Sequence, residues 1–146
     1  PRIPQPPEEP AALVVSRSGR FDPALRFFSQ PLERWLLTPA PPAAALVGFQ
    51  AHQRLGSWPE TLLELAAAGF QRLVVLGGAD LAGQLLAAEL VDELQLTLCP
   101  TLLGGPHTWL PPGFDLRAGA PWRLVEQRGL AGDELLLRYQ RGPGPA

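Results

Sequence analysis

The glycine pair Gly77-Gly78 is the first feature of the sequence that could do chemistry. It follows the aliphatic run "LVVL" and precedes "ADLAGQLLAAEL", which has the periodicity of a helix. The N-H groups at a helix N-terminus attract anions, and glycine lets a diphosphate approach them without a Cβ in the way. A dinucleotide is the ligand that best fits this pattern. The alternative is a tight turn in which Asp80 satisfies the helix end by itself.

The segment "VVSRSGR", Val14 to Arg20, is the second candidate. It follows another aliphatic run and combines serine hydroxyls with arginines. Arg17, flanked by Ser16 and Ser18, could bind a phosphomonoester such as the 2′-phosphate that distinguishes NADPH from NADH. The alternative is a solvated turn that carries surface arginines.

Other reactive side chains lack partners in the sequence. Cys99 is the only cysteine, and it forms no cluster of zinc-like spacing with His52 and His107. His107 lies in a proline-rich loop that could line a pocket, fix a chain reversal or contact another subunit, and no neighbour would activate it. No Ser-His-acid motif or carboxylate pair suggests hydrolysis. We expect no metal site and assign no catalytic residue.

Short aliphatic runs predict the strands that position both candidates. Ala11–Val15 ends at the serine-arginine segment, and Arg72–Leu76 ends at the glycine pair. Arg34–Thr38 and Ala44–Phe49 have the same composition. The alternation of leucine with polar residues over Leu94–Leu98 predicts a further strand with two unlike faces.

Two helices are predicted between these strands. "SWPETLLELAAAG" has Ser57 as its N-cap, Glu60 to complete a capping box, and Gly69 as its end. The second helix runs from Ala79 to Leu90 after the glycine pair. Strand, helix and strand joined by short links indicate a β-α-β unit with parallel strands.

At the C-terminal end, "WRLVEQRGL" and "ELLLRYQ" flank the turn "AGD" and predict an antiparallel hairpin. The expected fold class is therefore α/β, with a mixed, mostly parallel sheet flanked by helices and closed by this hairpin. The proline-rich "PRIPQPPEEP" predicts a linker over residues 1–10. A domain over residues 11–141 and a flexible tail over residues 142–146 complete the expected organisation.

Composition narrows the classes of function. The chain has 146 residues, of which 46% are hydrophobic and 18% charged, as is typical of one globular domain. A net charge of -2 without a basic field argues against nucleic acid as the partner. No apolar run approaches the roughly 20 residues that span a bilayer, and the chain does not start like a signal peptide, so we expect a cytoplasmic location without membrane binding.

Three pieces in order, "LVVSRSGRFDP", "RLVVLGGADLAGQLLAAELVDELQLTLCPTLLGG" and the closing hairpin, resemble the reductase domain of bacterial riboflavin biosynthesis, a branch of the dihydrofolate-reductase-like fold. The resemblance runs from about Ala11 to Gln140. It implies NADPH-dependent reduction of 5-amino-6-(5-phosphoribosylamino)uracil by hydride transfer. It also implies that Ser16, Arg17 and Ser18 face the adenosine 2′-phosphate, and that the diphosphate lies on Gly77, Gly78, Ala79, Asp80 and Leu81.

The chain departs from the family pattern in two ways. Leu76 stands where family members carry a glutamate close to the substrate, so a reductase of the same fold that acts on a pterin-like substrate is an alternative. The family domain normally begins with a strand, a helix and a strand that this sequence lacks, so a non-catalytic nucleotide-binding or dimerisation module is another. Family members commonly form homodimers, and the apolar hairpin could pair across a two-fold axis.

Overall fold

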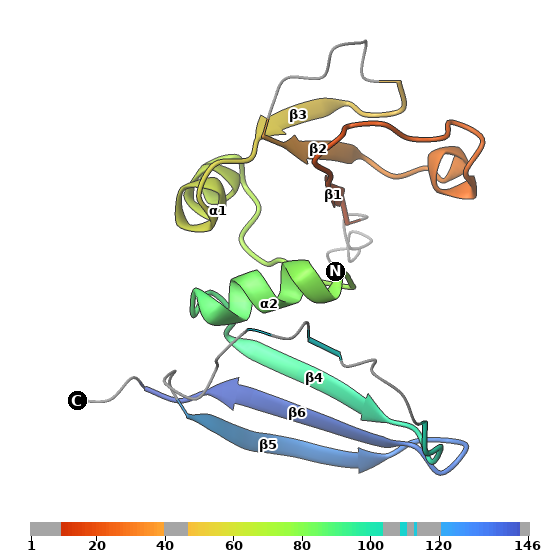
Figure 1. The fold of residues 1–146 in the computed structure, drawn as a ribbon, viewed down its shortest axis with the longest axis vertical. Coiled ribbons are helices and arrows are strands. Elements are labelled where there is room, and N and C mark those ends of the chain that lie inside the picture. Colours follow the sequence, from red (N-terminus) through yellow and green to blue (C-terminus); the bar gives the residue numbers. More distant parts are fainter. Residues whose placement is uncertain (1–9, 40–46, 104–108, 111–112, 114–120, 144–146) are drawn as a thin grey trace, which may run out of the picture. The chain divides into compact units, whose positions relative to one another are not determined.

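The computed structural model describes residues 10–39, 47–103, 109–110, 113 and 121–143. The chain divides into two compact units, Pro1–Phe70 and Gln71–Ala146, and each is described by itself. The first unit holds β1 (Ala12–Val15), the 3-10 helix η1 (Arg26–Ser29), β2 (Arg34–Thr38), β3 (Ala51–Arg54) and α1 (Trp58–Ala67) (Figure 1). The second holds α2 (Ala79–Ala87), β4 (Glu93–Leu98), β5 (Trp122–Gly129) and β6 (Leu135–Arg141).

The first unit is built on a parallel sheet in the order β1-β2-β3. The central strand β2 is buried on both faces, with Leu36 fully inaccessible and Leu37 only 2% exposed. Burial on both faces explains the apolar run at the centre of this short strand. The strands predicted at Ala11–Val15 and Arg34–Thr38 are confirmed.

Helix α1 begins where its capping box predicts. Ser57 Oγ accepts a hydrogen bond from the Glu60 N-H, and the Glu60 side chain accepts one from the Ser57 N-H. Beyond its last turn, the Phe70 ring packs edge-on against Trp35 of β2, with centroids 5.0 Å apart. Leu65, on the same helix, is 1% exposed. This helix therefore supplies part of the core of the first unit.

A buried guanidinium holds η1 to β2. Arg34 is only 4% exposed, and it donates hydrogen bonds to the carbonyls of Phe27 (2.8 Å), Leu32 (2.9 Å) and Gln30. Its Cζ atom also lies 5.2 Å from the centroid of the Phe27 ring. Charge-assisted hydrogen bonds are the kind that make burial of an arginine tolerable. Sequence reasoning assigned no role to this residue beyond its place in a strand.

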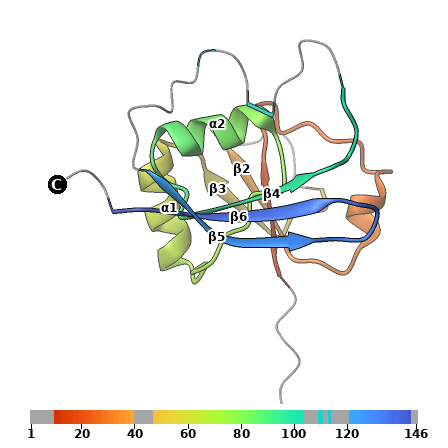
Figure 2. The same cartoon turned by 90° about the horizontal axis from the view of Figure 1, so that it is seen from below.

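The second unit contains an antiparallel sheet in the order β4-β6-β5, whose three strands lie side by side in Figures 1 and 2. The predicted C-terminal hairpin is confirmed, because β5 and β6 pair antiparallel and the Leu130 N-H donates to the Glu134 carbonyl across the turn (2.8 Å). The strand predicted over Leu94–Leu98 is also confirmed. It pairs with β6, and Leu136 of β6 is 7% exposed.

Two predicted strands differ from the structure. In the segment Ala44–Phe49, residues 44–46 lie outside the described residues and residues 47–49 include a turn, so the strand prediction is wrong there. The strand starts instead at Ala51, opposite Trp35 in the ladder. The run Arg72–Leu76 is not a strand, since it joins no ladder among the described residues. An extended segment without a neighbouring strand cannot form the inter-strand hydrogen bonds that define a sheet.

These differences also change the expected topology. The predicted parallel β-α-β unit around α2 is wrong for the described residues, because its first strand is absent and β4 runs antiparallel to β6. The described residues form one parallel and one antiparallel sheet in place of the single mixed sheet expected. Helix α2 ends at Ala87, before the predicted Leu90, because Glu89 adopts φ 57° and the Leu90 N-H turns back to the Leu85 carbonyl. The predicted linker, domain and tail boundaries stay predictions.

Candidate functional site

The amino end of α2 is open. Gly78 is the N-cap, with φ 84° and ψ 100°, and no side chain caps the helix. Such a positive φ is accessible to glycine without steric cost. The N-H groups of Ala79, Asp80 and Leu81 have no hydrogen-bond acceptor among the described residues. These donors and the partial positive charge of the helix end form a surface that suits an anion.

Helix α1 shows how side chains can close a helix end. At α1, the side chains of Ser57 and Glu60 satisfy the helix terminus through the capping box. At α2, the first-turn carboxylate of Asp80 accepts no hydrogen bond from the described residues. The turn in which Asp80 closes its own helix is therefore absent. A Cβ placed at Gly77 would meet nothing within 4 Å, so there is open space beside this glycine.

The segment Ser16–Arg20 forms a tight turn at the end of β1. The Gly19 N-H donates to Ser16 Oγ (3.1 Å), and the Arg20 N-H donates to Ser18 Oγ (3.3 Å). Both hydroxyls accept from the backbone and keep their own protons for a ligand. Arg17 and Ser18 are exposed, and Ser16 is half-buried. Among the described residues, Arg17 has no ion-pair partner.

The predicted site residues thus gather into two groups. Ser16, Arg17 and Ser18 lie in one turn of the first unit, while Gly77, Gly78, Ala79, Asp80 and Leu81 lie at one helix end of the second. Arg20 belongs to the first group but was not among the predicted cofactor residues. The signal that could have found it is its place in the same turn as Arg17.

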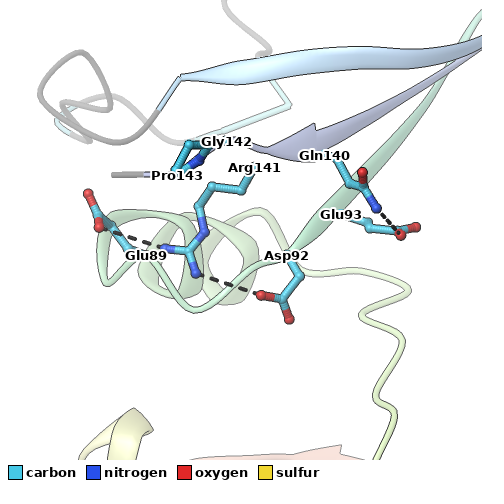
Figure 3. A pocket seen from close by; sticks show the side chains of 7 residues that line it. All are labelled: Glu89, Asp92, Glu93, Gln140, Arg141, Gly142 and Pro143. Carbon is cyan, nitrogen blue, oxygen red and sulfur yellow. Dashed lines mark hydrogen bonds and ion pairs between the residues drawn. The ribbon is translucent and has the colours of Figure 1, made fainter. Parts of the chain in front are cut away.

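A cavity of about 490 Å³ in the second unit contains none of these residues (Figure 3). Its lining comes from the segment between α2 and β4 and from the end of β6: Glu89, Asp92, Glu93, Gln140, Arg141, Gly142 and Pro143. Figure 3 shows the Arg141 side chain extending between two carboxylates. Its guanidinium lies 3.7 Å from Glu89 Oε2 and 3.7 Å from Asp92 Oδ1. Because these carboxylates offset its charge, Arg141 is poorly suited to bind a phosphate.

The remaining reactive groups offer no catalytic arrangement within the described residues. Cys99 Sγ lies 3.6 Å from Glu134 Oε1, and that carboxylate raises the pKa of the thiol above its ordinary value. A raised pKa lowers the thiolate fraction, so the arrangement disfavours nucleophilic chemistry.

The part of the chain that the structure describes holds no cluster of three or more His, Cys, Asp or Glu residues able to bind a metal. His107 lies outside the described residues. No helix in the described ranges is long and apolar enough to cross a membrane.

Comparison with known sequences gives a consistent family. The model of the RibD C-terminal domain matches residues 2–133. The riboflavin biosynthesis protein RibD of Haemophilus influenzae is 31% identical over 140 residues, and the match covers 90% of this chain. The RibD of Escherichia coli is 31% identical over 149 residues, covering 88% of this chain. In both cases the chain spans only 37% of the relative's length.

Solved structures share the fold. A pyrimidine reductase-like protein from Corynebacterium diphtheriae superposes with a TM-score of 0.73 at 19% identity, over 92% of this chain and 62% of that one. One crystal form of Acinetobacter baumannii RibD gives a TM-score of 0.74 at 22% identity, over 91% of this chain and 38% of that one. At these identities the likeness is one of fold.

Proposed function

Because the chain belongs to the RibD C-terminal domain family, whose members are oxidoreductases, we propose that it is an NADPH-dependent reductase domain of riboflavin biosynthesis. The proposed substrate is 5-amino-6-(5-phosphoribosylamino)uracil, whose ribosyl group becomes a ribityl group. Bound NADPH would supply the hydride for this reduction. The chain's own residues then need only bind, orient and shield the reactants, which agrees with a sequence that offers no acid-base pair.

The observation that carries this proposal is the open amino end of α2. Its N-H groups at Ala79, Asp80 and Leu81 have no acceptor among the described residues, and a Cβ at the nearby Gly77 would meet nothing within 4 Å, which suits a diphosphate. A dinucleotide cofactor contains such a diphosphate. The proposed role of these residues is to bind it through the backbone and so to fix the position of the nicotinamide.

The turn at Ser16–Arg20 supports the choice of NADPH over NADH. Its two hydroxyls keep donors for phosphate oxygens, and Arg17 has no competing carboxylate among the described residues. An arginine can form paired hydrogen bonds with a phosphomonoester, which NADPH carries on its adenosine ribose and NADH lacks. We assign Ser16, Arg17 and Ser18 to this 2′-phosphate.

Titration with NADPH and NADH tests the assignment. The parent chain is expected to bind NADPH more tightly, and Arg17→Glu should weaken NADPH binding by about 1–3 kcal/mol, because a charge-assisted hydrogen bond is replaced by repulsion. Arg26→Glu is the matched control, since Arg26 is also an exposed arginine of the first unit but lies in η1. Equal affinities of the parent for both nucleotides would contradict the role of Arg17.

The substrate is the less constrained part of the proposal. Leu76, where the resemblance leads one to expect a glutamate, is 94% exposed and carries no group that could hydrogen-bond a substrate. This observation favours a second candidate, a reductase of the same fold acting on a pterin-like substrate. Turnover of the phosphoribosylamino uracil with NADPH distinguishes the two. Nucleotide binding without turnover of either substrate would instead favour a non-catalytic binding or dimerisation module.

We also propose a homodimer formed through the C-terminal hairpin. Leu124 and Val125 of β5 are 45% and 36% exposed, and Leu135 of β6 is 37% exposed, so the hairpin carries apolar surface that a second copy could cover. The cytoplasmic location expected from the sequence likewise stays a prediction.

A further inference from the structure

Arg20 closes the turn that contains Arg17 and has no assigned role. We propose that Arg20 is a second specificity-determining residue, whose guanidinium binds the same phosphomonoester as Arg17. The inference rests on the proposed function, since it extends the 2′-phosphate site by one cation. It is carried by the geometry of the turn, by the contacts that anchor it and by its local charge.

Arg17 and Arg20 belong to the same closed turn. Its closure depends on two backbone-to-hydroxyl hydrogen bonds, from the Gly19 N-H to Ser16 Oγ (3.1 Å) and from the Arg20 N-H to Ser18 Oγ (3.3 Å). Gly19 adopts φ 60°, a conformation that reverses the chain at little cost in glycine. The backbone of Arg20 is thus tied to the hydroxyl of a residue that is itself assigned to the phosphate.

Both ends of the turn are fixed to the core of the first unit. Before the turn, the Ser16 N-H donates to the Leu37 carbonyl of β2 (3.0 Å). After it, the Phe21 ring packs against Phe49 and Phe28, with centroid separations of 5.1 and 6.1 Å. A Cβ on Gly19 would lie 3.8 Å from the buried Leu36 side chain, so the middle of the turn also rests on the core. Ordering such a backbone before the ligand arrives lowers the entropic cost of binding.

The local charge favours a dianion. Arg17 and Arg20 are both exposed, and neither has an ion-pair partner in the part of the chain that the structure describes. The nearest acid in sequence, Asp22, accepts a hydrogen bond from the Ala24 N-H through Oδ1 (2.9 Å) and forms no ion pair with either arginine. A phosphomonoester carries about -1.5 to -2 charges at neutral pH, so two guanidinium groups match it better than one.

Calorimetric titration of the full chain with NADPH and NADH tests this proposal. We expect Arg20→Gln to weaken NADPH binding about tenfold, the loss of one charge-assisted hydrogen bond, and to leave NADH binding within about twofold. Arg26→Gln is the matched control and should leave both affinities unchanged. Thermal melting of each variant checks that the fold is intact. An unchanged NADPH affinity in Arg20→Gln, or an equal loss for both nucleotides, overturns the inference.

A double-mutant cycle shows whether the two arginines bind one group. If they share the phosphate, the NADPH affinity lost in the Arg17→Gln, Arg20→Gln double variant should differ from the sum of the two single losses, because charges that contact one group influence each other. Fully additive losses would overturn the shared site. A parent chain that prefers NADPH, and depends on Arg17 but not on Arg20, refutes this inference alone. A parent chain that binds neither nucleotide refutes the proposed function as well.

Discussion

At the scale of single residues, Arg34 shows how a charged side chain can serve packing. We expect Arg34→Met to lower the free energy of unfolding by about 2–4 kcal/mol, because the carbonyls of Phe27, Gln30 and Leu32 would lose their buried donor. Arg34→Lys should lose less, since an ammonium can satisfy some of these acceptors, and Arg26→Met on the surface should change little. Urea denaturation of the variants measures the difference. Similar values for Arg34→Met and Arg26→Met would contradict the role.

The residues of the candidate site, whose roles stay predictions, were easier to select from the sequence than Arg34. Glycine pairs and serine-arginine segments can be recognised from residue type alone. Few other residues expose the backbone, or present the several hydrogen-bond donors of a guanidinium, at the end of an element. Arg34 could not be recognised in this way. Its partners are backbone carbonyls of the 3-10 helix η1 and of the residues that follow it. Backbone carbonyls are present in every residue, so the sequence carries no sign of which ones will converge.

At the scale of elements, the capping box makes the stability of α1 depend on pH. Hydrogen bonds from Ser57 hold the pKa of Glu60 below its ordinary value of 4.5. A lowered carboxyl pKa stabilises the fold above the unfolded-state value, and this contribution is lost as the pH falls through the folded-state value. We expect Ser57→Ala to cost about 1 kcal/mol at neutral pH and distinctly less in acid well below pH 4.5. Denaturation of parent and variant at both pH values measures this. A cost independent of pH would contradict the coupling.

Elements with local signals were predicted well, and elements that depend on distant partners were not. The start of helix α1 is marked in the sequence by the capping-box residues Ser57 and Glu60. The hairpin is marked by a turn sequence between two strands that are adjacent in the chain. The run Arg72–Leu76 has the composition of a buried strand but joins no ladder among the described residues. The residue composition of a segment indicates a preference for the strand conformation, whereas the presence of neighbouring strands decides whether a sheet forms.

At the scale of the whole molecule, this unpaired run is an apolar surface. Val74 is 81% exposed and Leu76 is 94% exposed, and no described residue shares a ladder with them. Free backbone donors and acceptors beside apolar side chains are a template for pairing with another chain. We therefore expect the chain by itself to self-associate as its concentration rises, through a contact distinct from the C-terminal hairpin.

Sedimentation velocity over a range of concentrations measures this association. Val74→Lys should reduce it, because a charge beside the free backbone opposes strand pairing. Leu63→Lys is the matched control: Leu63 is 71% exposed but lies in α1, where the backbone hydrogen bonds are made within the helix. The contact through Val74 predicts that only Val74→Lys shifts the distribution toward smaller species. Equal behaviour of the two variants would show that exposed apolar area, and not an unpaired strand, drives the association.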